Sequence, residues 1–232
     1  MALPTDPAES FVREVDENLR RDQAEQFLRK NGPLIVGGLL LLLAAIAGWF
    51  YWQDRQAQTA ASDAEKLNAV MNDIGTGSEA TIAKRIGDLQ ASSSEGVATQ
   101  AKLTNAAMLI DQGKKAEAIA IYKAIAEDGG LEQPYRDLAT VRQTALEFDT
   151  LKPEQVIARL ESLAKAGNPW FGSAGEMTAM AMLKQNRTSE AGRMFAAIAA
   201  DRQVPETIRS RAVQIAGTLG VDATAALPDL SR

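Results

Sequence analysis

The longest apolar run in the chain lies near its N-terminus. No formal charge falls between Lys30 and Asp54, and residues 33–52 are apolar on every side until an aromatic cluster at Trp49–Trp52. A bilayer core about 30 Å thick needs roughly 20 apolar residues at the rise of an α-helix. Aromatic rings gather where such a helix leaves the membrane. The pattern therefore predicts a transmembrane helix over residues 32–53.

Two other interpretations of this run are a cleaved signal peptide and the buried helix of a soluble domain. Ala45-Ile46-Ala47 fits a small-x-small cleavage site. However, thirty-two residues of mixed charge precede the apolar run, and cleavage would leave an exposed aromatic N-terminus. A buried helix would carry a polar stripe, which this run lacks. We therefore expect an uncleaved anchor.

Basic residues predict the orientation of this anchor. Within about 20 residues of the anchor, the N-terminal flank holds five basic residues, whereas the C-terminal flank holds only Arg55 and Lys66. The flank with more basic residues stays in the cytoplasm. The N-terminal residues are Arg13, Arg20, Arg21, Arg29 and Lys30. We expect a cytoplasmic N-terminus and, in a bacterium, a periplasmic C-terminal part.

Beyond the anchor, apolar residues recur every three or four positions, which is the period of a helix. Alanine is frequent, and no window alternates as a strand would. Prolines stand at the expected helix starts, and glycines, with Asn186 in the same role, stand at the expected ends. The fold class is therefore all-α. The predicted helix pairs are 56–73 with 79–91, 96–112 with 114–127, 133–149 with 153–166, and 169–185 with 187–200, followed by a capping helix over 205–219.

An internal repeat organises these helices. Segment 112–128, QGKKAEAIAIYKAIAED, matches segment 185–201, QNRTSEAGRMFAAIAAD, at an offset of 73 residues, about twice the tetratricopeptide period of 34. Four copies follow one another at intervals of 36, 38 and 35 residues. Because one copy cannot bury its apolar face alone, the copies should stack into an array. The predicted repeat core is Ile82, Ile86, Leu89, Ala118, Tyr122, Ile125, Val156, Leu160, Leu163, Ala191, Phe195 and Ile198.

The N-terminal motifs carry a family resemblance. FVREVDENLRRDQ, Asn31-Gly32 before the anchor and Gly48-Trp49-x-Tyr51-Trp52 at its exit, followed by degenerate repeats, resemble the YfgM-like ancillary subunits of the bacterial SecYEG translocon. FVREVDENLRRD is similar to the alphaproteobacterial branch of that family. The Trp-x-x-Leu-Gly-x-x-Tyr signature of tetratricopeptide repeats is missing. The resemblance implies a non-enzymatic scaffold whose partners are the SecYEG translocon, a PpiD-type periplasmic chaperone and secreted chains.

These patterns divide the chain into four expected parts. Residues 1–31 form a cytoplasmic segment and residues 32–53 the transmembrane anchor. Residues 54–220 form a periplasmic tetratricopeptide-like repeat domain, and residues 221–232 a C-terminal tail. The expected location is the bacterial inner membrane, crossed once.

Composition narrows the chemistry of the chain. It has neither cysteine nor histidine, so thiol nucleophiles, imidazole bases, disulfides and the common zinc ligands are excluded. A net charge of −5 with scattered basic residues disfavours nucleic-acid binding. Ser162-x-x-Lys165 matches a nucleophile and base pattern but lacks its companion motifs, and Gly75-Thr76-Gly77 follows no strand as a phosphate loop would. We therefore expect no enzyme and no cofactor.

Two sets of residues are candidate contact sites. Gly37, Ala44 and Gly48 share one face of the anchor, where small side chains would let a partner helix approach, although such residues are also common in plain anchors. Trp170 and Phe171 could contact a bound peptide, because aromatic residues are frequent at binding hot spots. They could equally form a wedge between two repeats, which we favour.

Three functions remain at this point. The first is an interaction scaffold beside the Sec translocon that assists the biogenesis of secreted or membrane proteins. The second is a scaffold of another envelope or division complex with the same architecture. The third, the least favoured, is an envelope enzyme that uses a carboxylate acid such as Glu176, for which no positioned second group is evident.

Overall fold

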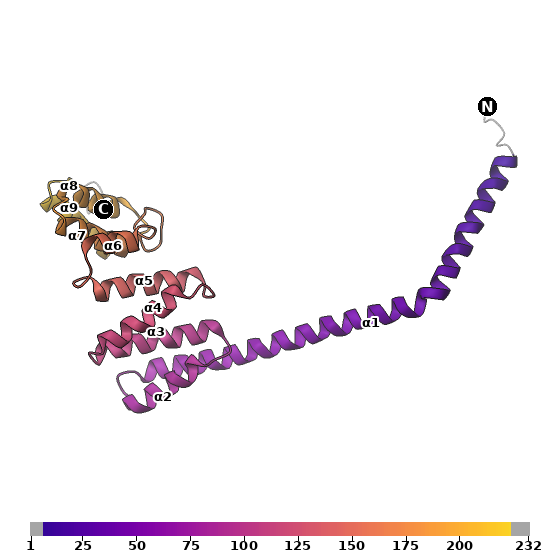
Figure 1. Cartoon of the computed structure of the whole chain (residues 1–232), viewed down its shortest axis with the longest axis horizontal. Helices are drawn as coiled ribbons and strands as arrows, with labels where there is room; N and C mark the ends of the chain where they lie inside the picture. The colour runs from indigo at the N-terminus through magenta and orange to yellow at the C-terminus, as the bar shows by residue number, and fades with distance from the viewer. Residues whose placement is uncertain (1–6, 224–232) are drawn as a thin grey trace, which may run out of the picture. The chain divides into compact units, whose positions relative to one another are not determined.

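The computed structural model describes residues 7–223, and within that range the secondary structure is entirely helical. This confirms the all-α class. The helices are α1 Pro7–Asp73, α2 Glu79–Gln90, α3 Glu95–Asp111, α4 Lys115–Glu127, α5 Gln133–Glu147, α6 Pro153–Leu160, α7 Phe171–Lys184, α8 Thr188–Ala200 and α9 Glu206–Thr218 (Figure 1). The chain divides into two units, one up to Thr59 and one from Ala60 onward, which are described separately below.

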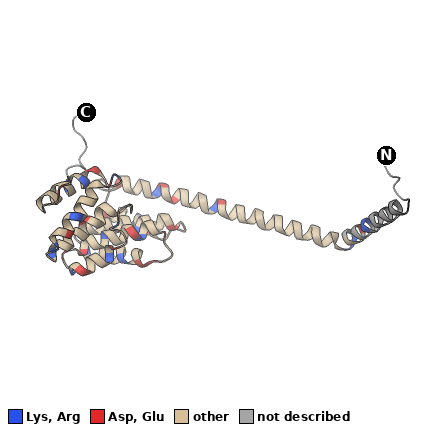
Figure 2. Cartoon of the chain, turned by 90° about the horizontal axis from the view of Figure 1, so that it is seen from above, with Lys and Arg blue, Asp and Glu red and all other residues tan. Residues whose placement is uncertain are grey.

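The first unit is the long N-terminal part of α1. Its side chains from Leu34 to Trp52 are mostly exposed, and none of the apolar window that qualifies as a membrane span is buried. Figure 2 shows a continuous stretch of this helix without Lys, Arg, Asp or Glu. A buried core helix is therefore excluded here, and the helix is long and apolar enough to cross a membrane. Pro33 lies inside it and has no N–H to bond to the preceding turn, which bends helices.

The second unit is a stack of helix pairs. The end of α1 packs with α2, and α3, α4 and α5 follow in sequence, each against its neighbour (Figure 1). The same order continues through α6, α7, α8 and α9. In the described part of the chain, the buried apolar side chains form four clusters, each shared between neighbouring helices. This arrangement buries apolar faces that no single pair could cover.

The backbone conformation after the helices recurs at equivalent positions of two repeat copies. Gly113 has φ 74° after α3, and Asn186 has φ 61° after α7, 73 residues further on. Asn is one of the few side-chain-bearing residues that adopt this left-handed conformation readily. Asn186 was expected in this role, so the same backbone cap recurs in two copies with different residues.

One predicted helix is shorter than expected. The pattern predicts a helix over residues 153–166, but α6 ends at Leu160 and the chain continues in successive turns to α7. The N–H groups of Leu163 and Ala164 both bond the carbonyl of Leu160 at the start of these turns. Gly167 has φ 86° and Pro169 lacks an N–H, so the helix cannot continue through them. Leu163 therefore reaches the core from a turn.

Candidate functional site

The twelve residues of the predicted repeat core lie inside the stack. Each is less than 9% exposed, and together they supply members of all four apolar clusters. Tyr122, Phe195 and Ile198 are among the largest of them. Side chains in such positions mainly hold the copies together; of the twelve, Tyr122 and Ile82 also line the hollows described below.

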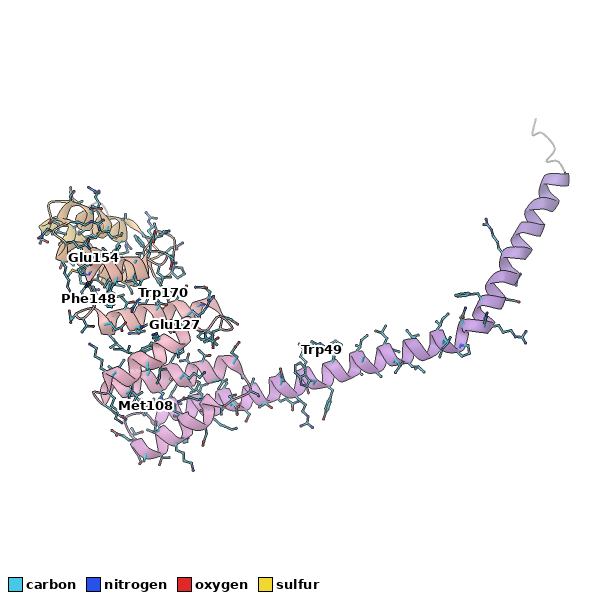
Figure 3. All side chains as sticks on the ribbon, viewed as in Figure 1. Trp49, Met108, Glu127, Phe148, Glu154 and Trp170 are labelled. Atoms are coloured by element: carbon cyan, nitrogen blue, oxygen red, sulfur yellow. The ribbon has the colours of Figure 1, made fainter. Side chains whose placement is uncertain are left out.

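A groove opens on the face formed by the first helices of successive pairs. Met71 and Ile74 line it from the end of α1 and the turn after it, Leu103 and Ile110 from α3, and Leu138 from α5; its volume is about 450 Å³. Among the described residues, Tyr122 alone reaches this lining from a second helix of a pair. A neighbouring cavity of about 340 Å³ shares Ile74 and Asp111 with it and continues toward Met108, which Figure 3 labels. The neighbouring cavity is more polar than the groove, because Glu79 and Gln112 also line it.

The exposure of large apolar side chains singles out this groove. Within the described part of the second unit, such side chains are exposed at Met71, Ile74, Ile110 and Met180, by 36% to 44%. The first three all line the groove. Single exposed apolar residues need no explanation, but three gathered in one hollow make it the candidate binding surface.

These residues also follow the repeat. Met71 and Ala107 stand 36 residues apart, the interval that separates Ile82 from Ala118, and Met180 follows Ala107 at the offset of 73. Ile74 and Ile110 stand 36 residues apart as well. Sequence reasoning missed this set because it followed the repeat only along the second helices. The same intervals applied to the first helices would have found it.

The groove holds two charged side chains of opposite sign. Arg142 of α5 lines it close to Tyr122, and Asp111 lines it at the end of α3. Burial raises the pKa of the Tyr122 phenol, and the positive charge of Arg142 offsets part of that effect. A largely apolar surface with one guanidinium and one carboxylate can fix the orientation of a bound segment.

The carboxylate considered for an enzymatic role is already engaged. Both oxygens of Glu176 accept hydrogen bonds from Arg211, at 2.5 and 2.6 Å. Ser162 and Lys165 lie exposed in the turns after α6. Among the described residues, no group of three or more acidic, histidine or cysteine side chains could hold a metal ion.

The two predicted aromatic contacts lie away from the groove. Phe171 is 2% exposed and packs in the cluster of α7, α8 and α9, beside Phe195. Trp170, labelled in Figure 3, is half-buried against the cluster that contains Val156 and Leu160. The pair thus contributes to two neighbouring clusters, which is the position expected of a wedge between repeats.

The candidate contact face of the anchor lies in the first unit. Ala44 and Gly48 are exposed, Gly37 is partly exposed, and no described atom outside the helix lies within 4 Å of a Cβ built on either glycine. At the end of the apolar stretch, the rings of Trp49 and Trp52 are 5.5 Å apart. The contact of this face with a partner helix stays a prediction.

Comparisons with known proteins agree with the repeat architecture. The family model of the tetratricopeptide repeat-like domain matches residues 25–219. No curated protein and no solved structure matches the chain. The matched range covers most of α1 and all of the helices from α2 to α9.

Proposed function

We propose, since the chain belongs to the tetratricopeptide repeat-like domain family, that it is a membrane-anchored scaffold which holds a segment of a partner protein in the groove between α1, α3 and α5. Domains of this family mediate protein–protein interactions. The observation that carries the proposal is the concentration of Met71, Ile74 and Ile110 in one hollow of the second unit. Methionine suits such a surface because its flexible thioether adapts to different partners.

The finer proposal places this scaffold beside the Sec translocon. The N-terminal motifs resemble YfgM-like subunits, and the basic N-terminal flank favours a cytoplasmic N-terminus with residues 54–220 in the periplasm. The groove would then bind secreted chains or a PpiD-type chaperone. Gly37, Ala44 and Gly48 offer a contact face for a membrane-embedded partner helix.

Site-specific photocrosslinking in native membranes tests this proposal. A photoreactive residue replaces Met71 or Ala107 in the groove, and matched probes replace Ala120 of α4 and Ala197 of α8, which are exposed outside it. We expect the groove probes to capture translocon components, periplasmic chaperones or secreted chains, and the matched probes to capture none of these. Equal capture at all four positions, or none at any, would contradict a groove that binds protein segments.

The same experiment separates the alternative scaffold from the leading one. Capture of cell-wall or division proteins at Met71 and Ala107 would retain the scaffold function and assign it to another envelope complex. A second probe set at Gly37 and Ala44 tests the anchor face. Crosslinks from these positions to a membrane protein are expected only if the anchor recognises a partner within the bilayer.

A further inference from the structure

Arg142 is the arginine that lines the groove. Among the described residues, Arg136, Arg193 and Arg202 also lack an ion pair, but none of them lines it. Arg85, Arg159, Arg187 and Arg211 each pair with a carboxylate at 2.5 to 2.7 Å. Within the described residues, no carboxylate lies at ion-pair distance from Arg142, which is exposed and lines the groove. Its guanidinium therefore presents donors to whatever enters the groove.

Asp111 complements this charge from another helix. It ends α3, lines both the groove and the neighbouring cavity, and has no ion pair or side-chain hydrogen bond among the described residues. Leu103, Ala107 and Ile110 form an apolar stripe along α3 that leads toward it. The stripe is about 10 Å long, at 1.5 Å per residue.

We propose, building on the scaffold function above, that the groove selects an amphipathic helix of a partner protein that carries an acidic side chain beside its apolar face. Apolar side chains three and four residues apart on the partner pack on the stripe of α3, between the walls formed by α1 and α5. The acidic side chain pairs with Arg142. A basic residue toward the other end faces Asp111, so the two charges fix the direction in which the helix lies.

The charge pair selects among partners because the groove is largely apolar. An ion pair in a partly desolvated site is stronger than one on an open surface, and a partner without the carboxylate leaves Arg142 desolvated and unpaired. The planar guanidinium of Arg142 can donate two parallel hydrogen bonds to one carboxylate. We expect the acidic partner to bind about tenfold more tightly than its neutral counterpart.

Peptide binding to the full chain in detergent or nanodiscs tests the inference. The probe is a fluorescent synthetic Ala/Leu helix with leucines every three or four residues and one glutamate beside them; matched peptides carry glutamine or lysine instead. We expect affinities in the order Glu, Gln, Lys. The Arg142→Gln variant should bind the glutamate and glutamine peptides with equal affinity. The control variant Arg193→Gln, changed on the exposed face of α8, should keep the original order of the three affinities.

A charge reversal excludes misfolding as an explanation. Arg142→Glu should gain affinity for the lysine peptide, a result that an unfolded chain cannot produce. Equal binding of all three peptides to the original chain, or failure of all three to bind, would overturn the inference. So would undiminished binding of a peptide whose helix is broken by proline, and so would groove crosslinks that join two copies of this chain.

The failure of this inference can be told apart from the failure of the scaffold function. If the peptides bind without regard to charge and Ile110→Glu abolishes their binding, the groove still holds protein segments and only the acidic selectivity is wrong. If groove probes in native membranes also capture no protein, the scaffold function fails as well.

Discussion

A substitution of Gly192 in α8 tests whether the segment after α9 packs against that helix. A Cβ at this position would lie 2.7 Å from Cγ2 of Val221 and 3.4 Å from Cβ of Leu219. The segment after α9 therefore folds back onto α8, where Val221 and Ala223 pack in the cluster with Phe195. Packing onto the array thus extends past residue 220, where the sequence places the start of the tail. Replacement of Gly192 by alanine must displace this segment.

Two effects of opposite sign decide the outcome. Alanine in place of glycine inside a helix stabilises a protein by about 0.5–1 kcal/mol. A methyl group forced into a packed site costs about 1–3 kcal/mol, and part of that cost here is the lost burial of Val221. At 2.7 Å from a branched side chain on an irregular segment, the steric cost is the larger. We expect a net loss of about 1–2 kcal/mol.

Urea and thermal unfolding of the chain, followed by circular dichroism, measure this loss. A matched control is Gly87→Ala in α2, because no described atom lies within 4 Å of a Cβ built there. The control should gain about 0.5–1 kcal/mol. Each kcal/mol shifts the midpoint by about 2–4 °C in a domain of this size, so the two variants should move in opposite directions.

A combined substitution isolates the contact itself. In a Val221→Ala background, Gly192→Ala should be less destabilising, because the atom that it meets is gone. If Gly192→Ala raised the unfolding midpoint as much as Gly87→Ala, the segment after α9 would not rest on α8. The reasoning from packing at this end of the stack would then be refuted.

Three further predictions concern the groove, the topology and the response to acid. Ile110→Glu should abolish groove crosslinks yet change unfolding stability by only about 0.5 kcal/mol, because Ile110 is 36% exposed; Ala120→Glu should preserve the crosslinks. Since the chain has no cysteine, a single cysteine at Ser189 should react with an impermeant maleimide in spheroplasts, and one at Ser10 only after lysis; the reverse result would invert the proposed orientation. Hydrogen bonds from Lys66 and Ser92 lower the pKa of Asp63 below 3.8. Its contribution to stability is therefore present above pH 3.8 and lost as the pH falls through the lowered pKa, so the stability gap between the original chain and Asp63→Asn should close in acid.

The helical class and the pairing of helices were predictable because both rest on local periodicity. Apolar residues at helical spacing, with proline before and glycine after, predicted helix ends that the structure confirms to within a few residues, with two exceptions. The helix predicted to start at residue 56 is the last part of α1, which runs unbroken from Pro7, and the second helix of the third pair is shorter than predicted. The error at α6 arose because Leu163 continues the helical spacing of Val156 and Leu160 and was therefore predicted to be part of the helix. Leu163 is 4% exposed, but it lies in a turn, and a residue can be buried without being helical.

The groove was less accessible to sequence reasoning. Met71, Ile110 and Arg142 come from three different helices, and only the stack brings them to one hollow. Trp170 and Phe171, an adjacent aromatic pair of the second unit, suggested either a peptide contact or a wedge; in the structure Phe171 is buried in one cluster and Trp170 is half-buried against the next. A large side chain can serve either purpose, and its neighbours in space decide which.

By itself, the sequence determined the all-α class, the period of the repeat and one helix apolar enough to cross a membrane, because each depends on residues close together in the chain. The tertiary structure decided which faces remain open once the copies have stacked. It placed an unpaired Arg142 beside Tyr122, engaged Glu176 with Arg211, and folded Val221 onto α8. Such contacts join residues that are far apart in sequence, and only the packing of one repeat on the next sets their distances.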